Sequence, residues 1–361
     1  MNPQLNSLYH RAIQPSLNLH KKQTSLSSEL ENRSSNIKPL LRASDNGSRS
    51  TLQEQIFPKN ISVLFAKRAN SFTHIEPSLS VQKQLATGVK KSTIKVNYKG
   101  KVPQSVQTAF QYAASIWQTV ISSRIPITIQ VSWEKEKPLY LGSTAVLEAW
   151  RDFQHAPLKN TWYPIALANK FAGRDLDPNL PDAVINLNRN QPWYFGTDGN
   201  VPQGQFDLVT TAMHEINHAT SIFGFMNYGS RTGKGSWGFN TGFPELYDRF
   251  IINGSGQRLL NTKHFPNPSK ALGNQLTGNN LFFNGTHARN ANGGKPPKLY
   301  APSHWEPGSS YAHLDEATYP PGNPNSLITP GFNFAEAIHN PGPIAMGILK
   351  DMGWISKSIA P

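Results

Sequence analysis

Five consecutive residues in the middle of the chain carry side chains suited to metal chemistry. They are His214-Glu215-Ile216-Asn217-His218, the pattern HExxH. On a helix, two histidines four positions apart lie on one face and can bind one metal ion, and the glutamate beside the first histidine can reach a water molecule on that ion. The pattern predicts a zinc site in which His214 and His218 are ligands and Glu215 is the catalytic general base.

The residues around this motif have the spacing of a helix that buries one face. Between Phe206 and Phe225, apolar residues recur at intervals of three and four, which is the period of an amphipathic helix. An amphipathic helix whose two histidines bind nothing is the alternative interpretation. The sequence contains no cysteine, which excludes disulfides and thiolate ligands, so any further metal ligand must be His, Asp or Glu.

A catalytic zinc ion usually has three protein ligands and one open position, so one ligand must come from outside the motif. A compact arrangement, with glycine three residues and histidine six residues after the second histidine, fails because these positions hold Ser221 and Gly224. Glu245 is the nearest downstream glutamate, but its surroundings do not form a clear ExxxD helix. His304 and His313 lie further on, and the residues alone leave both open.

The region around these two histidines resembles the leishmanolysin-like zinc metallopeptidases of the metzincin group and their bacterial relatives. In that group a long insertion separates HExxH from a G-S-x-x-S-H-[WL]-[DE] segment, which is followed by an L-M-T-P turn. The matching residues here are Gly308-Ser309, Ala312-His313-Leu314-Asp315 and Leu327-Ile328-Thr329-Pro330. The resemblance extends from about residue 92 to residue 354, and its specific parts are the two site segments.

This resemblance implies a zinc-dependent endopeptidase with His214, His218 and His313 as ligands and Glu215 as general base. His304, in the fragment His304-Trp305-Glu306, is the second candidate for the third ligand. The implied reaction is hydrolysis of peptide bonds in a protein or peptide substrate. Tyr311 and Tyr319 lie nearby in sequence and are candidates for stabilising an oxyanion.

Two departures from the family pattern favour an alternative, a non-catalytic zinc-binding protein on the same scaffold. Ile328 occupies the position of the turn methionine, where it can fill similar space. The Gly224-Phe225 pair also lies three residues later than in the family, so we expect the HExxH helix to run about one turn longer.

The rest of the chain predicts an α+β fold of the zincin type: a twisted sheet, a backing helix, the HExxH helix and a loop-rich C-terminal subdomain that ends in a helix. Other histidines, His264, His287 and His339, are expected on the surface. The predicted strands are Ser92–Tyr98, Ile127–Trp133 and Ala183–Leu187, with an edge-like strand at Pro138–Ala145 that could pair with extended substrate. The predicted helices are Ser105–Ser122, Thr161–Ala172 and Pro343–Met352, and ordered islands are expected at Leu246–Ile252 and Leu281–Phe283.

The first quarter of the chain differs in composition from the rest. Residues 1–90 contain 12 Lys and Arg against 5 Asp and Glu, with few apolar residues, so we expect a mostly disordered basic region with a helix near Ser50–Phe57. The catalytic domain is predicted at 91–356, divided into 91–225 and 226–356. No specific nucleic-acid binding is expected, because basic residues form no dense cluster with aromatics.

The chain contains no apolar run of the ~20 residues that span a bilayer and no recognisable signal peptide. We therefore expect a soluble protein, which could still be exported from a bacterium by a signal-independent route. Its oligomeric state does not follow from the sequence.

Overall fold

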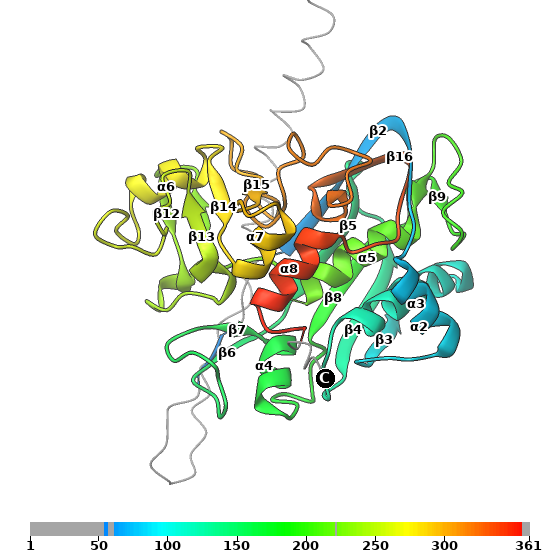
Figure 1. Cartoon of the computed structure of the whole chain (residues 1–361), viewed down its shortest axis with the longest axis horizontal. Helices are drawn as coiled ribbons and strands as arrows, with labels where there is room; N and C mark the ends of the chain where they lie inside the picture. The colour runs from blue at the N-terminus through cyan, green and yellow to red at the C-terminus, as the bar shows by residue number, and fades with distance from the viewer. Residues whose placement is uncertain (1–53, 57–60, 221, 356–361) are drawn as a thin grey trace, which may run out of the picture. The chain divides into compact units, whose positions relative to one another are not determined.

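The computed structural model describes residues 54–56, 61–220 and 222–355 (Figure 1). Its largest sheet in these ranges is mixed, has six strands and packs beside the helix that contains the HExxH motif. The strand order is β16-β2-β5-β8-β4-β3, and β5 alone runs against its neighbours. The strands are β2 (Ile61–Ile75), β3 (Ile94–Lys99), β4 (Ile127–Glu134), β5 (Tyr140–Val146), β8 (Ala183–Asn188) and β16 (Gly331–Ile338).

Two helices pack against each other and against one face of this sheet (Figure 1). They are α3 (Gln104–Val120) and α5 (Leu208–Ala219), and the indole N–H of Trp117 donates to the carbonyl of Met213 at 3.0 Å. Ile185 on β8 and Thr144 on β5 are opposite one another and fully buried on this face. Their neighbours along each strand are half-buried, so alternation directs one face of the sheet into the core.

The remaining elements surround this layer. Short strands are β1 (Glu54–Ile56), β6 (Ala149–Arg151), β7 (Tyr163–Pro164), β9 (Trp193–Tyr194), β10 (Phe206–Asp207), β11 (Asn227–Gly229) and β12 (Lys234–Ser236), and β13 (Ile251–Asn253), β14 (Leu281–Phe283) and β15 (Lys298–Leu299) form an antiparallel sheet. Helices are α2 (Leu79–Thr87), α4 (Ile165–Ala172), α6 (Lys270–Leu276), α7 (Thr286–Ala291) and α8 (Pro343–Asp351), with 3-10 turns η1 (Gly238–Asn240), η2 (Tyr247–Phe250) and η3 (Ser326–Ile328).

The structure is a mixture of helices and a mixed sheet, as an α+β class requires. The predicted strands Ser92–Tyr98, Ile127–Trp133 and Ala183–Leu187 correspond to β3, β4 and β8, and the predicted helices correspond to α3, α4 and α8. The final helix has proline in its first turn, and Gly353 follows it with a φ of 90°, which is the left-handed conformation that ends helices.

The N-terminal region differs from the expectation wherever it is described. Residues 61–90 were expected to be mostly disordered, but Ile61–Ile75 form β2 and Leu79–Thr87 form α2. The low average hydrophobicity of the region hides a local run from Ile61 to Ala66, and Leu64 from that run is fully buried. Residues 1–53 lie outside the described part. The helix expected near Ser50–Phe57 is wrong at Glu54–Ile56, which form strand β1.

The predicted edge-like strand, Pro138–Ala145, is an interior strand. It corresponds to β5, which pairs with β8 on one side and with the beginning of β2 on the other. The strand β16 was also not predicted, because Gly331–Ile338 follows a long irregular stretch and alternates only partly. The sheet therefore extends beyond β5 through β2 and β16.

The predicted boundary at 225/226 does not separate two cores. One continuous hydrophobic cluster contains Leu64, Trp117 and Met213 from the first part and Leu272, Ile328 and Trp354 from the second. None of the helices in the described ranges combines the length and the hydrophobicity that spanning a membrane requires.

The start of α5 provides a test of how firmly the HExxH helix is held. The Asp207 carboxylate accepts hydrogen bonds from the amide and the hydroxyl of Thr210, at 2.9 and 2.6 Å, and lies 2.7 Å from Nε2 of His339. Replacing Asp207 with alanine removes an N-cap and leaves His339 without this partner. We expect Asp207→Ala to lower the free energy of unfolding by about 2 kcal/mol or more in a denaturant titration.

Ser269→Ala is the matched control, because Ser269 caps the shorter helix α6 and its hydroxyl accepts one hydrogen bond from the amide of Leu272. We expect it to cost about 1 kcal/mol or less. Equal effects of the two substitutions would contradict the role given to the Asp207–His339 contact.

Candidate metal centre

Helix α5 places the HExxH side chains inside the protein. All of its residues are buried, and His214, Glu215 and His218 have 0% of their surface exposed. His214 and His218 are one helical turn apart, so their imidazoles project from the same side. Trp117 of α3 holds this turn of the helix through the carbonyl of Met213.

The helix ends immediately after its second histidine. The amide of Thr220 donates to the carbonyls of Ile216 and Asn217, and the chain then turns so that the carbonyl of Ile222 lies 2.8 Å from Nδ1 of His218. The expectation of one further helical turn is therefore wrong. A longer helix would carry the Ile222 carbonyl away from the ring that it orients.

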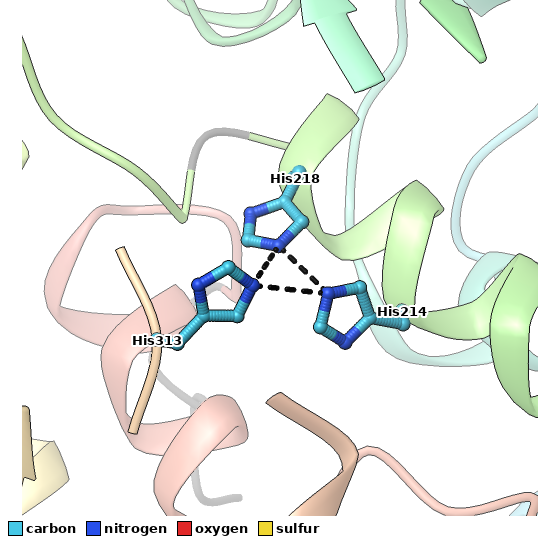
Figure 2. A group of neighbouring side chains, drawn as sticks. All are labelled: His214, His218 and His313. Atoms are coloured by element: carbon cyan, nitrogen blue, oxygen red, sulfur yellow. Dashed lines mark hydrogen bonds between the residues drawn. The ribbon is translucent and has the colours of Figure 1, made fainter. Parts of the chain in front are cut away.

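The three histidines expected as ligands meet at one point (Figure 2). The Nε2 atom of His214 lies 3.0 Å from that of His218 and 3.1 Å from that of His313, and the remaining Nε2–Nε2 distance is 3.1 Å. His313 is 1% exposed. Two of these rings come from α5, and the third comes from a segment 95 residues after His218.

The other nitrogen of each ring determines what the central nitrogens can do. Each Nδ1 lies within hydrogen-bonding distance of a backbone carbonyl: His214 at 2.7 Å from Leu327, His218 at 2.8 Å from Ile222 and His313 at 2.8 Å from Ser309. A carbonyl only accepts, so each Nδ1 carries the proton and each neutral ring has an unprotonated Nε2.

Three unprotonated Nε2 atoms cannot hydrogen-bond to one another, because none has a proton to donate. Their lone pairs converge on one point and repel one another unless a cation lies between them. A tetrahedral ion with metal–nitrogen bonds of about 2.0–2.1 Å would separate its nitrogens by roughly 3.3 Å, which is close to the observed 3.0–3.1 Å. The arrangement fits a metal ion.

Burial keeps these imidazoles in the form that binds a metal. It lowers the pKa of His313 to about 4, and it lowers the pKa of His214 and of His218 well below 6.5, with repulsion from neighbouring histidines as a second cause for these two. All three rings are neutral at neutral pH, and neutral imidazole is the ligand.

Glu215 lies beside the histidines and against strand β5. Its Oε2 accepts a hydrogen bond of 2.6 Å from the hydroxyl of Thr144, which also lies 3.0 Å from the Glu215 carbonyl. Its Oε1 has no protein partner among the described residues. A Cβ at Gly142 would lie 2.9 Å from Oε1, so this glycine makes room for the carboxylate.

The environment of Glu215 also changes its acidity. Burial raises the pKa of the Glu215 carboxyl to about 8, although the Thr144 hydrogen bond acts in the opposite direction. Burial therefore moves the pKa of this carboxyl toward neutral pH, where a group can both accept and donate a proton, and the positive charge of a bound metal ion would act in the opposite direction to burial.

The other candidate ligands lie elsewhere. His304 is exposed and lies outside the histidine group. Glu245 is fully buried, and its Oε2 accepts from the amide of Tyr247. Burial, together with the charge of Asp248, raises its pKa well above the ordinary value.

Neither tyrosine candidate has its hydroxyl free for an oxyanion. The Tyr311 hydroxyl accepts from the amide of Met226 and donates to Asp248, which ties the loop after α5 to the segment of His313. The Tyr319 hydroxyl lies 3.2 Å from Oδ1 of Asn292.

The remaining histidines differ in their exposure. His264 is exposed and His287 half-buried. His339, expected on the surface, is 1% exposed, because it pairs with the N-cap of α5.

The short turn η3 contacts His214 and the residue after His313. Ile328, which stands where the family turn has methionine, is 1% exposed and packs in the core, and its carbonyl accepts from the amide of Leu314. The preceding carbonyl, from Leu327, orients His214. The contacts that this turn makes with His214 and Leu314 thus come from its backbone, which isoleucine supplies as well as methionine does.

The groups that orient the ligands have no signal in the sequence. Three of them are the backbone carbonyls of Ile222, Ser309 and Leu327, which carry no side-chain signal. Thr144 lies within the predicted edge-like strand, and only the pairing of that strand beside α5 shows its contact with Glu215.

Comparison of the chain with protein-family models, with curated proteins and with solved structures finds no match. The assignment of the site therefore rests on its own geometry.

The geometry distinguishes His313 from His304 as the third ligand. We expect His313→Ala to weaken Zn²⁺ binding by at least about 100-fold, because loss of a ligand costs more than the 10–100-fold typical of a supporting residue. His304→Ala is the matched control and is expected to bind as the unaltered protein does. Competition with a chromogenic chelator measures both affinities, and the reverse ranking would exclude the assignment.

The acidity of the ligands predicts how metal binding depends on pH. Protons compete with the metal for the imidazoles. This competition begins only when the pH falls to the pKa that the histidine rings have in the folded protein. Since that pKa is about 4 for His313 rather than 6.5, we expect protonation of this ring to leave the affinity for Zn²⁺ unchanged at pH 5.5 and to lower it only below about pH 4. Equilibrium dialysis measures the affinity, and a midpoint near that of free imidazole would contradict this expectation.

Proposed function

We propose that this protein is a zinc-dependent endopeptidase of the zincin type, related to the leishmanolysin-like metallopeptidases. The observation that carries the proposal is the convergence of three unprotonated Nε2 atoms beside the carboxylate of Glu215 on one helix. A catalytic zinc site needs three protein ligands and an open position, and His214, His218 and His313 supply three. Imidazole sets also suit copper, iron and nickel, and the adjacent glutamate favours zinc because HExxH is a hydrolytic arrangement.

The metal ion, Glu215 and Thr144 have different roles in the proposed reaction. Bound Zn²⁺ would lower the pKa of a water molecule and polarise the scissile carbonyl. Glu215 accepts the proton from the attacking water and delivers a proton to the leaving amine. Thr144 holds Oε2 of that carboxylate at 2.6 Å, which leaves Oε1 for proton transfer.

The second segment of the resemblance supports the same function. Gly308-Ser309 precede His313, and Leu327–Pro330 follow it with Ile328 in place of the family's methionine. Contacts from these segments support the histidines: the Ser309 carbonyl accepts from His313, and the Leu327 carbonyl accepts from His214. Both contacts come from backbone carbonyls that lie within the two segments of the resemblance.

A non-catalytic metal-binding protein is the second candidate, and one observation favours it. The three histidines and Glu215 are at most 1% exposed, whereas a peptidase must admit a polypeptide. The two candidates differ in what Glu215 does, since a structural metal site requires only the histidines.

Replacing Glu215 with glutamine separates these functions. Glutamine keeps the shape and cannot accept the proton, so we expect Glu215→Gln to retain Zn²⁺ and to lose at least about 100-fold of the rate on a denatured protein substrate. A chelator should abolish the activity of the unaltered protein, and added Zn²⁺ should restore it. Chelator-sensitive cleavage at equal rates by both proteins would exclude the proposed role of Glu215.

A further inference from the structure

The beginning of β2 lies in the sheet directly beside β5, the strand that contacts Glu215. These five residues, Ile61–Phe65, are named the cover strand. On one side they pair antiparallel with β5, from Ile61 opposite Ala145 to Leu64 opposite Gly142. The cover strand therefore lies where extended substrate was expected to pair with β5.

The other side of the cover strand is bound by the segment that carries His313. The Val63 amide donates to the carbonyl of Gly308 at 3.0 Å, and the Ser309 hydroxyl donates to the carbonyl of Val63 at 3.0 Å. Further along, the Phe65 amide donates to Pro330 at 2.9 Å. The carbonyl of Ser309 also orients His313. Ser309 therefore contacts both the cover strand and a predicted metal ligand.

The strand register shows which side chains face the site. Thr144 and Gly142 both face Glu215, one through a hydrogen bond and the other through close approach. Residues directly opposite each other in an antiparallel pair share a face. Ser62, opposite Thr144, and Leu64, opposite Gly142, therefore face α5 as well, and they are 3% and 0% exposed.

Two polar atoms on this face have no partner among the described residues. They are the hydroxyl oxygen of Ser62 and Oε1 of Glu215, both buried. Buried polar atoms without partners are costly. Ser62 belongs to the cover strand itself, so of these two atoms only Oε1 of Glu215 would remain on this face when the strand leaves.

We propose that the cover strand occupies the groove in which an extended polypeptide substrate binds, and that it keeps the metal centre closed. This inference rests on the proposed peptidase function. When the cover strand leaves, the edge of β5, the Gly308 carbonyl and the Ser309 hydroxyl become free to bind a peptide backbone, which is recognition by strand addition. The same departure exposes Glu215 and the histidines.

A reversible cross-link tests this proposal in the full chain. The backbone groups of Val63 point to Gly308 and Ser309, so Val63 and Ser143 form a pair without hydrogen bonds between them. Cα atoms in such a pair are about 4.5 Å apart, within the range of a disulfide. The two side chains lie on the face away from Glu215, and the chain has no other cysteine.

The test uses Val63→Cys/Ser143→Cys with Leu64→Ala, which removes the buried anchor of the cover strand and favours its release. With reductant, we expect at least about tenfold faster cleavage of denatured protein than in the oxidised form. Single-cysteine variants should not respond to oxidant. Leu272→Ala, in a buried position of α6, is the control for lost stability and should not increase cleavage. Measurable cleavage at equal rates in the two redox states would overturn the proposal.

A binding measurement separates this proposal from the peptidase itself. A labelled peptide of residues 60–66, NISVLFA, is added to the cross-linkable Leu64→Ala protein that also carries Glu215→Gln, and fluorescence anisotropy is recorded. We expect binding to the reduced form, none to the oxidised form and none of the reversed-sequence peptide. If the peptide binds but the variant that keeps Glu215 does not cleave protein, the groove proposal stands and the peptidase proposal is rejected. If the peptide binds neither the reduced nor the oxidised form, the groove proposal is overturned.

Discussion

The site depends on three hydrogen bonds that point away from it. Each histidine donates its Nδ1 proton to a backbone carbonyl, so each presents a lone pair to the same point. Three converging lone pairs in a buried space are unfavourable without a cation, and the fold must hold them there. The packing of α3, α5 and η3 supplies that constraint, because a core residue cannot move without opening a cavity.

The constraint joins parts of the chain that are distant in sequence. Ile222 follows α5 directly, Ser309 precedes His313 by four residues, and Leu327 lies in η3. Asp207 and His339 connect the start of α5 to the end of β16, while Tyr311 connects the loop after α5 to the His313 segment. The long stretch between the two ligand segments is thus part of the architecture that positions the ligands.

The sequence predicts those features that depend on local pattern. HExxH and its helical period place two histidines on α5, and alternation locates β3, β4 and β8. The third ligand, His313, is predicted only through the resemblance to a known family. Its approach to His214 depends on packing between segments 99 residues apart, which local pattern does not show. The cover strand could not be predicted, since Ile61–Ala66 is a short apolar run in a polar region, and its partner β5 looks like an edge when considered alone. The chain turns after the end of α5 so that the Ile222 carbonyl reaches His218. No side-chain pattern in the sequence predicts this backbone contact.

The central claim is that His214, His218 and His313 hold one metal ion. Anomalous diffraction at the zinc edge, from crystals of the zinc-loaded protein, tests it most directly. The account predicts one strong peak about 2.0–2.1 Å from each of the three Nε2 atoms. A peak at His304 or elsewhere, with no density between the three rings, would contradict it.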